Sequence, residues 1–219
     1  MTTEIILIRH GETDWNAAGR WQGVANVPLN ETGRGQSQAL AQRLATWPLD
    51  ALYSSDLVRA AETAQIVGAA RQMPVILDAA WRERDVGLFA GCTTAEIVER
   101  YAPGWTGENS WQNPPQGETS LAFRARVTAA LAALVAGHPG QRVAVVTHGG
   151  VLFSVLGHLF GRGPEEPLPI AGRVNTSLSV LRADGAQLQL LRLNDYAHLE
   201  QSGMINEAAA GVSSAVRPL

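Results

Sequence analysis

Residues 5–11 read IILIRHG, and residues 143–149 read VAVVTHG. Each stretch is a short, mostly apolar run that ends in a histidine followed by a glycine. Continuous apolar runs of this length are typical of strands buried on both faces of a parallel sheet. Ligands bind beyond the carboxyl ends of the strands in such sheets. The repeated pattern therefore predicts one pocket, with His10 and His148 facing each other across it.

Strand and helix patterns alternate outward from these two stretches. Further strands are expected at residues 51–54, 74–77, 176–182 and 186–193, and helices at residues 32–47, 57–70, 93–101, 118–137 and 151–160. The alternation predicts one α/β domain with a largely parallel sheet that is covered on both faces. We expect this domain to span residues 1–202, and the alanine-rich tail, residues 203–219, to be poorly ordered.

Individual residues are expected to set the limits and faces of these elements. Thr32 and Asp56 precede helices and are expected to cap them. Asp184-Gly185 is a hairpin turn signal between the last two strands. The apolar face of the helix at residues 118–137 is expected to comprise Leu121, Val127, Leu131 and Leu134.

The composition excludes several classes of protein. The chain has 219 residues, 46% hydrophobic and 17% charged, as expected for one packed domain. All 17 basic residues are arginine, which excludes Schiff-base, pyridoxal phosphate and P-loop lysine chemistry. A net charge of -3 does not suit a general nucleic-acid binder, so no nucleic-acid partner is expected. Cys92 is the only cysteine, which excludes intrachain disulfides and a thiolate zinc cage.

The sequence predicts no membrane partner. The N-terminus carries an acid and no basic cluster, and the apolar run at residues 5–8 is too short for a signal peptide. No stretch approaches the roughly 18 uninterrupted apolar residues of a membrane span. A cytoplasmic protein is therefore expected.

Paired histidines suit either an anion or a metal, so other patterns in the sequence matter. A histidine beside glycine at the end of a strand lies where backbone N–H groups attract anions, and Arg9 adds a charged fork suited to phosphate. The sequence has no HxH, HExxH or DxD pattern, so no metal cage is indicated. It also lacks the GxSxG elbow of serine hydrolases. Cys92 has no arginine six residues later, which excludes cysteine phosphatase chemistry.

The segment LIRHGETDWN at residues 7–16 resembles the defining motif of the histidine phosphatase superfamily, the phosphoglycerate mutase-like family. Further matching segments follow in the family's order: YSSDLVRAAETA at 53–64, RE at 82–83 with Gly87 and Gly91, GET at 117–119, VVTHGG at 145–150, and NDYAHL at 194–199. The last of these is similar to a motif of the small phosphatase branch. The resemblance implies a three-layer α/β/α sandwich with a largely parallel central sheet.

The resemblance also implies roles for individual side chains. His10 is expected to be the nucleophile that becomes phosphohistidine. Glu83 is expected to be the general acid that protonates the leaving alkoxide and then the base that activates water. If Glu83 is not the acid, the next candidates are Glu12, Asp85 and Glu118. The residues expected to bind the phosphoryl group or the rest of the substrate are Arg9, Asn16, Gln22, Gly23, Arg59, His148 and Gly149.

Fixed positive charge agrees with these roles. Two arginines and a second histidine can replace the magnesium of other phosphatases, because phosphoryl transfer depends mainly on positioning and charge. The same charges disfavour the protonated form of His10 and so keep its imidazole neutral for attack. Neither a metal nor a cofactor is expected.

Members of this family either hydrolyse phosphate monoesters, as phosphatases, or isomerise phosphoglycerate, as mutases. Mutases of this family carry an inserted segment with an arginine pair that binds the substrate carboxylate. Residues 101–116 contain no arginine and no lysine, and offer Trp105 and Trp111 instead. The mutase pattern Glu-Arg-x-Tyr-Gly is broken at residues 83–87, which read ERDVG. The prediction is a metal-independent phosphatase of phosphate monoesters, with a phosphoglycerate mutase as the alternative and a catalytically silent phospho-ligand binding module as the third interpretation.

A small phosphorylated metabolite is the expected partner. Sugar phosphates, phosphoglycerates, nucleotides and α-ribazole phosphate all fit this description. Trp15, Trp21, Trp81, Trp105 and Trp111 lie near the motifs and belong either to the core or to an aromatic pocket wall. A monomer and a homodimer are both compatible with this sequence.

Overall fold

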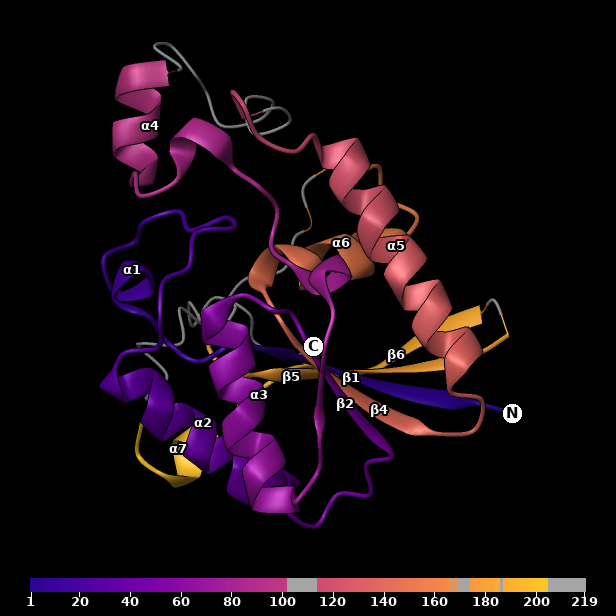
Figure 1. Cartoon of the computed structure of the whole chain (residues 1–219). Coiled ribbons are helices and arrows are strands. Elements are labelled where there is room, and N and C mark those ends of the chain that lie inside the picture. The colour runs from indigo at the N-terminus through magenta and orange to yellow at the C-terminus, as the bar shows by residue number, and fades with distance from the viewer. Residues whose placement is uncertain (102–113, 167, 169–173, 186, 205–219) are drawn as a thin grey trace, which may run out of the picture.

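The centre of the molecule is a six-stranded sheet with the strand order β3-β2-β4-β1-β5-β6 (Figure 1). The computed structural model describes residues 1–101, 114–166, 168, 174–185 and 187–204. The strands are β1 (Thr3–Arg9), β2 (Ala51–Ser54), β3 (Val75–Leu77), β4 (Arg142–Thr147), β5 (Leu178–Asp184) and β6 (Gln187–Asp195). The expected tail and the segment with Trp105 and Trp111 lie largely outside the described residues.

Helices surround this sheet. They are α1 (Asp14–Ala17), α2 (Glu31–Leu44), α3 (Val58–Arg71), α4 (Thr94–Tyr101), α5 (Ser120–Gly137), α6 (Gly149–Leu159) and α7 (Ala197–Gln201), with the short 3-10 helices η1 (Ala79–Trp81) and η2 (Gly87–Phe89). α4 lies close to the segment after α1 (Figure 1), where Arg20 pairs with Glu96 at 3.1 Å.

β1 and β4 form the parallel pair at the centre of the sheet, in a register that aligns Arg9 with Thr147 at their carboxyl ends. β2 and β3 extend the parallel part beyond β4. β5 and β6 are antiparallel and lie on the other side of β1. The predicted largely parallel sheet therefore has one antiparallel edge, whose turn contains Gly185 with a φ of 58°.

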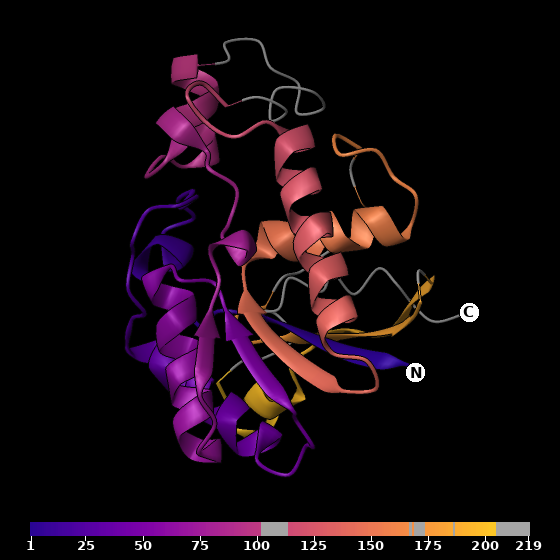
Figure 2. The same ribbon diagram turned by 45° about the vertical axis from the view of Figure 1, so that its right-hand side comes forward.

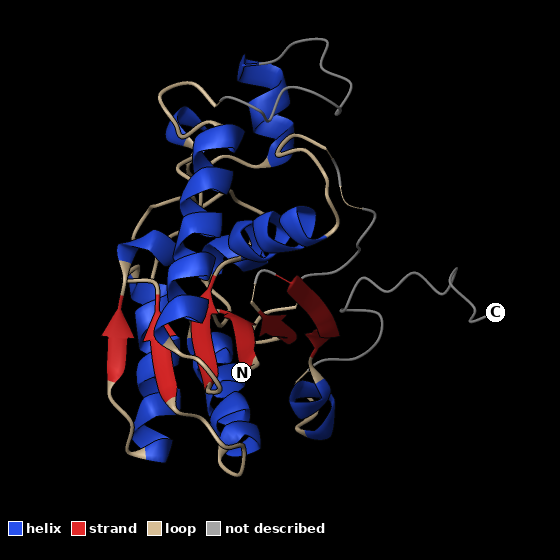
Figure 3. Cartoon of the chain, turned by 90° about the vertical axis from the view of Figure 1, so that its right-hand side faces the viewer, coloured by secondary structure: helices blue, strands red, loops and turns tan. Residues whose placement is uncertain are grey.

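Both faces of the sheet are buried, which explains the continuous apolar run of β1. Ile5 and Leu7 belong to a core cluster that includes residues of α5 and α6. Ile6 and Ile8 belong to a second cluster that includes residues of α2 and α3. Figures 2 and 3 show the sheet between these two groups of helices. The predicted three-layer α/β/α sandwich is confirmed.

The expected caps of two helices are wrong. Asn30, not Thr32, caps α2, because its side chain accepts a hydrogen bond from the backbone nitrogen of Gly33 at 2.8 Å. α3 has no side-chain cap. Asp56 instead accepts a hydrogen bond from Nε of Arg82 at 2.6 Å. Its carboxylate therefore forms an ion pair with Arg82 and does not cap the helix.

α5 packs with most of the face expected, since Val127, Leu131 and Leu134 are buried, but Leu121 is not part of that face. Leu121 is 67% exposed, and the buried positions are Ser120, Phe123, Val127, Leu131 and Leu134. Among the described residues, α5 is the one helix that is long and apolar enough to cross a membrane. Its buried face belongs to the core, and both of its arginines donate hydrogen bonds within the fold. α5 is therefore explained as a core helix, and a cytoplasmic location stays a prediction.

Candidate active site

The two histidines of the repeated motif lie side by side at the carboxyl edge of the sheet. β1 and β4 are adjacent and parallel, so the residues that follow them meet. The backbone nitrogen of His10 donates to the carbonyl of Thr147 at 2.9 Å. The ring centroids of His10 and His148 are 5.2 Å apart, with their planes tilted by 57°. The predicted proximity of these residues is confirmed.

Two hydrogen bonds fix the tautomer of His10. Its Nδ1 lies 2.6 Å from the carbonyl of Gly11, which can only accept, so Nδ1 carries the proton. Nε of Arg59 donates to the other ring nitrogen, Nε2, at 3.3 Å. Burial and the charges of Arg59 and Arg9 hold the pKa of His10 well below its ordinary value. At neutral pH the ring is neutral, with its lone pair on Nε2.

Arg59 brings its charge to His10 from the first turn of α3. Its guanidinium is 1% exposed and donates to the carbonyls of Ala25 and Gly23, each at 2.7 Å. Burial lowers its pKa to about 10, so it stays charged at neutral pH. Gly23 has a φ of 51°, and a Cβ there would overlap Val86. Gly23 thus shapes the loop that holds Arg59, while its contact with a substrate stays a prediction.

His148 is fully buried behind the cavity. Its Nε2 lies 2.8 Å from Oγ of Ser55, which already accepts from the backbone nitrogen of Leu57 at 3.3 Å. This favours the Ser55 hydroxyl as donor to Nε2 and places the His148 proton on Nδ1. That buried nitrogen has no hydrogen-bond partner among the described residues. Burial and the charge of Arg59 keep the pKa of His148 well below its ordinary value.

Glu83 reaches the same site from the loop after η1. One carboxylate oxygen accepts from the backbone nitrogen of Arg84 at 2.8 Å, and the other from that of Gly150 at 2.9 Å. Gly150 belongs to the first turn of α6, directly after Gly149. A helix N-terminus favours negative charge, so α6 stabilises the carboxylate form of Glu83 and offers a place for a further anion.

Asn16 is held by its own helix. Its Oδ1 accepts from the backbone nitrogen and the hydroxyl of Thr13, at 3.2 and 3.1 Å. Asn175 adds a contact to the same oxygen at 3.4 Å and also donates to the carbonyl of His10 at 2.9 Å. The amide nitrogen of Asn16 is therefore the group left to bind an anion. The sequence alone did not point to Asn175 or Ser55 as site residues. Each acts only by a hydrogen bond to another site residue, Asn175 to His10 and Asn16, and Ser55 to His148.

Apart from the buried His148, the residues expected in the site line one cavity of about 680 Å³. Of the residues expected in the site, the cavity lining includes Arg9, His10, Asn16, Gln22, Gly23, Arg59, Glu83 and Gly149. Oε1 of Gln22 is buried without a hydrogen-bond partner among the described residues, while its contact with a substrate stays a prediction. Trp21 lines the cavity, whereas Trp81 is 1% exposed and belongs to the core. The aromatic-wall interpretation therefore holds for one of these two tryptophans.

The described part of the chain contains no group of three or more histidine, cysteine or acidic side chains that would hold a metal ion. Positive charge in the cavity comes from arginine instead. The cavity is lined by Arg9, Arg20, Arg59, Arg84 and Arg124. Such a site is suited to a phosphate ester.

Comparison with known proteins agrees with this geometry. A family model described as the histidine phosphatase superfamily, branch 1, matches residues 5–196. The chain belongs to the histidine phosphatase superfamily. The match covers β1 and β4 and ends just after β6. The resemblance inferred from the motifs is therefore confirmed.

Similar members of the superfamily include both mutase-like proteins and phosphatases. Phosphoglycerate mutase-like protein 4 of Arabidopsis thaliana is 36% identical, over 95% of this chain and 92% of the relative. A metal-independent phosphoserine phosphatase of the same plant is 34% identical, over 95% and 88%. The solved structure of Bacillus stearothermophilus YhfR has a TM-score of 0.82 at 31% identity, covering 90% of this chain and 99% of YhfR. Family and relatives together support a phosphatase.

Proposed function

We propose that this protein is a metal-independent phosphatase that hydrolyses phosphate monoesters of small organic molecules through a phosphohistidine on His10. The observation that carries the proposal is the state of the His10 ring. Nδ1 is tied to the carbonyl of Gly11, and Nε2 keeps its lone pair beside Arg59 in the cavity. A neutral, oriented imidazole is the form that attacks phosphorus.

In the first step, Nε2 of His10 attacks the phosphorus and the bond to the ester oxygen breaks. Arg9, Arg59 and Nδ1 of His148 bind the phosphoryl oxygens, where negative charge is spread in the transition state. In its carboxylic acid form, Glu83 gives its proton to the leaving alkoxide. The products of this step are the alcohol and phosphohistidine.

In the second step, water attacks the phosphorus and the bond to Nε2 breaks. The carboxylate of Glu83 takes a proton from that water. Inorganic phosphate leaves, and His10 regains its neutral ring with the lone pair on Nε2. Glu83 is then protonated again, as it was before the first step, so the cycle is closed.

The cavity supports a substrate with a body beyond the phosphate. Trp21, Phe123 and Phe153 line it together with Arg124. Arg124 donates to two neutral acceptors, Oγ of Ser154 at 3.0 Å and the carbonyl of Arg162 at 3.1 Å. Among the described residues it has no acidic partner, so its charge suits a carboxylate on the substrate. Phosphorylated hydroxy and amino acids are therefore the first compounds to test.

The deciding experiment is a screen of phosphorylated metabolites with purified protein, read by release of inorganic phosphate. O-phosphoserine, 3-phosphoglycerate, sugar phosphates, nucleotides and α-ribazole phosphate make up the panel. Hydrolysis of at least one alkyl phosphate, with a phosphohistidine trapped by rapid quenching, is the expected outcome. Binding without phosphate release would instead identify a silent phospho-ligand binding module.

A phosphoglycerate mutase is the second candidate, favoured by the 36% identity to phosphoglycerate mutase-like protein 4. With 3-phosphoglycerate and a bisphosphoglycerate primer, we expect free phosphate to form faster than 2-phosphoglycerate. The physical reason is the absence of arginine and lysine from residues 101–116, which leaves no basic pair to hold the carboxylate through two transfers. Faster isomerisation than hydrolysis would identify a mutase.

A further inference from the structure

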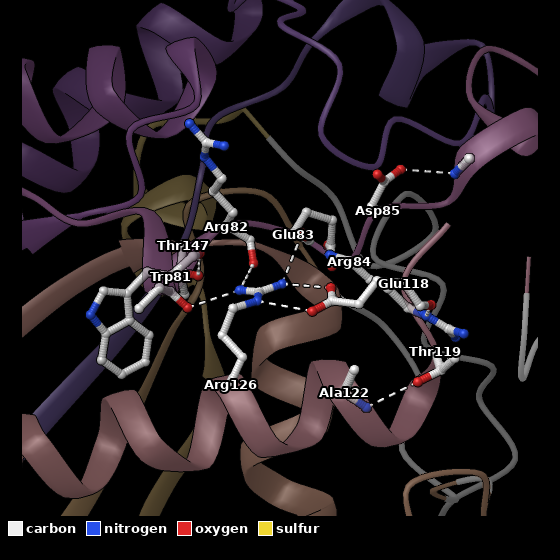
Figure 4. Close-up of polar contacts among 12 residues, drawn as sticks. Trp81, Arg82, Glu83, Arg84, Asp85, Glu118, Thr119, Ala122, Arg126 and Thr147 are labelled. Atoms are coloured by element: carbon white, nitrogen blue, oxygen red, sulfur yellow. Dashed lines mark hydrogen bonds and ion pairs between the residues drawn. The ribbon is translucent and has the colours of Figure 1, made fainter. Parts of the chain in front are cut away.

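One arginine outside the cavity lining, Arg126 in the second turn of α5, makes hydrogen bonds in two directions (Figure 4). Toward α5, its Nε and Nη2 donate to the two carboxylate oxygens of Glu118, at 3.0 and 2.7 Å. Toward the loop of Glu83, it donates to the carbonyls of Ala80, Arg82 and Glu83, at 2.9, 3.0 and 3.3 Å. All five N–H donors of the guanidinium are therefore used.

The loop that carries Glu83 is held almost entirely through its carbonyls. Arg126 holds three of them, and the hydroxyl of Thr147 donates to the remaining one, that of Trp81, at 2.8 Å. Four consecutive carbonyls, at residues 80–83, thus accept from side chains of α5 and β4. Beyond Glu83, the backbone of Glu118 continues the contact, because its nitrogen donates to the carbonyl of Asp85 at 2.8 Å.

Glu118 and Asp85 are placed to support this loop and not to transfer protons. Both carboxylate oxygens of Glu118 face Arg126, and Oδ1 of Asp85 accepts from the backbone nitrogen of Gly87 at 2.9 Å. Glu12, the remaining alternative acid, accepts from Nδ2 of Asn30 at 3.0 Å. None of the three is among the residues that line the cavity.

We propose that Arg126 and Glu118 are positioning residues for the acid–base chemistry of Glu83. Glu118 orients the guanidinium through a planar two-point contact. The guanidinium then fixes the loop, so that the carboxylate of Glu83 stays against the N-terminus of α6 and beside the leaving oxygen. This proposal rests on the proposed function, in which Glu83 is the acid and the base.

The test compares leaving groups. An aryl alcohol leaves without much protonation, whereas an alkyl alcohol needs the proton of Glu83. In Arg126→Gln we expect kcat to fall ~10–100-fold for O-phosphoserine, a partial loss of the ~10²–10⁴-fold that general acid–base catalysis contributes. The first step with p-nitrophenyl phosphate should slow less than ~3-fold. Phosphohistidine should accumulate with the aryl substrate, because its hydrolysis needs Glu83 as base.

Three further variants make the test specific. Glu118→Gln should give a smaller change in the same direction. The double variant should resemble Arg126→Gln alone, because the two residues act through one contact. Arg142→Gln is the matched control: it removes another arginine–glutamate pair, with Glu4, at the opposite end of β4, and should leave the ratio of alkyl to aryl rates unchanged.

The outcomes separate positioning from simple structural support. The positioning role would be overturned if the ratio of alkyl to aryl rates stays unchanged in variants whose urea midpoints show a folded protein. Arg126→Lys, which keeps the charge, serves the same comparison if Arg126→Gln does not fold. Absence of phosphate release from both substrates by the unmodified protein would instead contradict the proposed function.

Discussion

The carboxylate of Glu83 occupies the place that any side chain at position 150 would need. A Cβ added to Gly150 would overlap Oε1 of Glu83, while the backbone nitrogen of Gly150 donates to Oε2 at 2.9 Å. Glu83 and the N-terminal turn of α6 therefore pack directly against each other. This contact requires glycine at the second residue of α6.

Gly150→Ala should weaken the acid without touching the nucleophile. Alanine suits a helix better than glycine, so α6 itself is not disfavoured, and the effect comes from displacement of Glu83. We expect alkyl phosphate hydrolysis to fall ~10-fold or more, with a much smaller effect on aryl phosphates. Gly137→Ala, at the end of α5 where a Cβ meets nothing within 4 Å, is the matched control and should leave both rates unchanged.

His10→Ala and Glu83→Gln should fail in different ways. Without His10 no covalent bond forms, so turnover and phosphoenzyme should both be lost. Glu83→Gln should slow alkyl phosphates by ~100-fold or more, the usual contribution of a general acid, and accumulate phosphohistidine with an aryl phosphate. Intact mass of rapidly quenched samples measures this. Exposed Glu99→Gln is the control, and wild-type rates on alkyl phosphates in Glu83→Gln would exclude Glu83 as the acid.

Ser55→Ala should reduce both steps for both classes of substrate. The Ser55 hydroxyl is the partner of Nε2 of His148, and its loss frees that ring to change tautomer or orientation. Because His148 is proposed to bind the phosphoryl group, the loss should not depend on the leaving group. We expect kcat to fall ~10-fold, about the contribution of the hydrogen bond from His148 to the charged phosphoryl group. Ser54→Ala, whose hydroxyl bonds only the neighbouring carbonyl of Ser55, is the matched control. A selective loss of alkyl activity would contradict this role.

Catalysis should be independent of added metal. Arginines and the N-terminus of α6 supply the positive charge that a metal would otherwise provide. Activity on p-nitrophenyl phosphate is expected to survive exhaustive treatment with EDTA and to be blocked by vanadate, a mimic of five-coordinate phosphorus. A strict requirement for Mg²⁺ or Zn²⁺ after such treatment would refute this expectation.

Stability should fall as the pH drops from 7 to 5. Burial lowers the pKa of His198 to about 4, and those of His10 and His148 also lie well below 6.5. Below pH 6.5 the unfolded chain therefore binds protons that the folded chain does not, which favours unfolding. The depressed pKa of Asp195 acts only below its ordinary value of 3.8, outside this window.

Urea unfolding at the two pH values measures this effect. For each fully buried histidine the free energy of unfolding changes by at most about 1.4 kcal/mol per pH unit. His198→Gln should narrow the difference between the two midpoints, since glutamine can still bond Oγ1 of Thr176 but does not titrate. A midpoint independent of pH would show that these histidines are not buried as neutral rings.

The two histidines of the site could be predicted from local sequence, because each stands directly after a recognisable strand and directly before a glycine. Arg9 and His10 end a strand whose apolar run identifies it, and His148 with Gly149 ends another. Parallel strands place their carboxyl ends at one edge, so the meeting of these residues was predictable from the pattern. The family resemblance added Arg59 and Glu83, which local periodicity alone does not relate to His10.

The expectations that proved wrong concern two helix caps and one residue of a helix face, and in each case residues brought together by folding decided the outcome. Thr32 and Asp56 are good capping residues, yet Asn30 caps α2 and Arg82 takes the carboxylate of Asp56. Leu121 is apolar, but it lies off the buried face of α5, which contains Phe123, Val127, Leu131 and Leu134. Local sequence gives each residue's preferences, and the neighbours brought by folding decide among them.

The sequence by itself predicted the strands, a largely parallel sheet covered on both faces and two histidines at one edge suited to an anion, because buried strands, turn residues and the HG pairs act over a few consecutive positions. The family resemblance added the three-layer sandwich and the expected catalytic roles. The tertiary structure alone decided that Arg59 donates to Nε2 of His10 and that Ser55 orients His148. It also decided that Arg126 holds the loop of Glu83. These depend on contacts between residues 30 or more positions apart in the chain, such as Ser55 with His148 and Arg126 with Ala80. Only packing of the helices on the sheet brings such groups within hydrogen-bond distance.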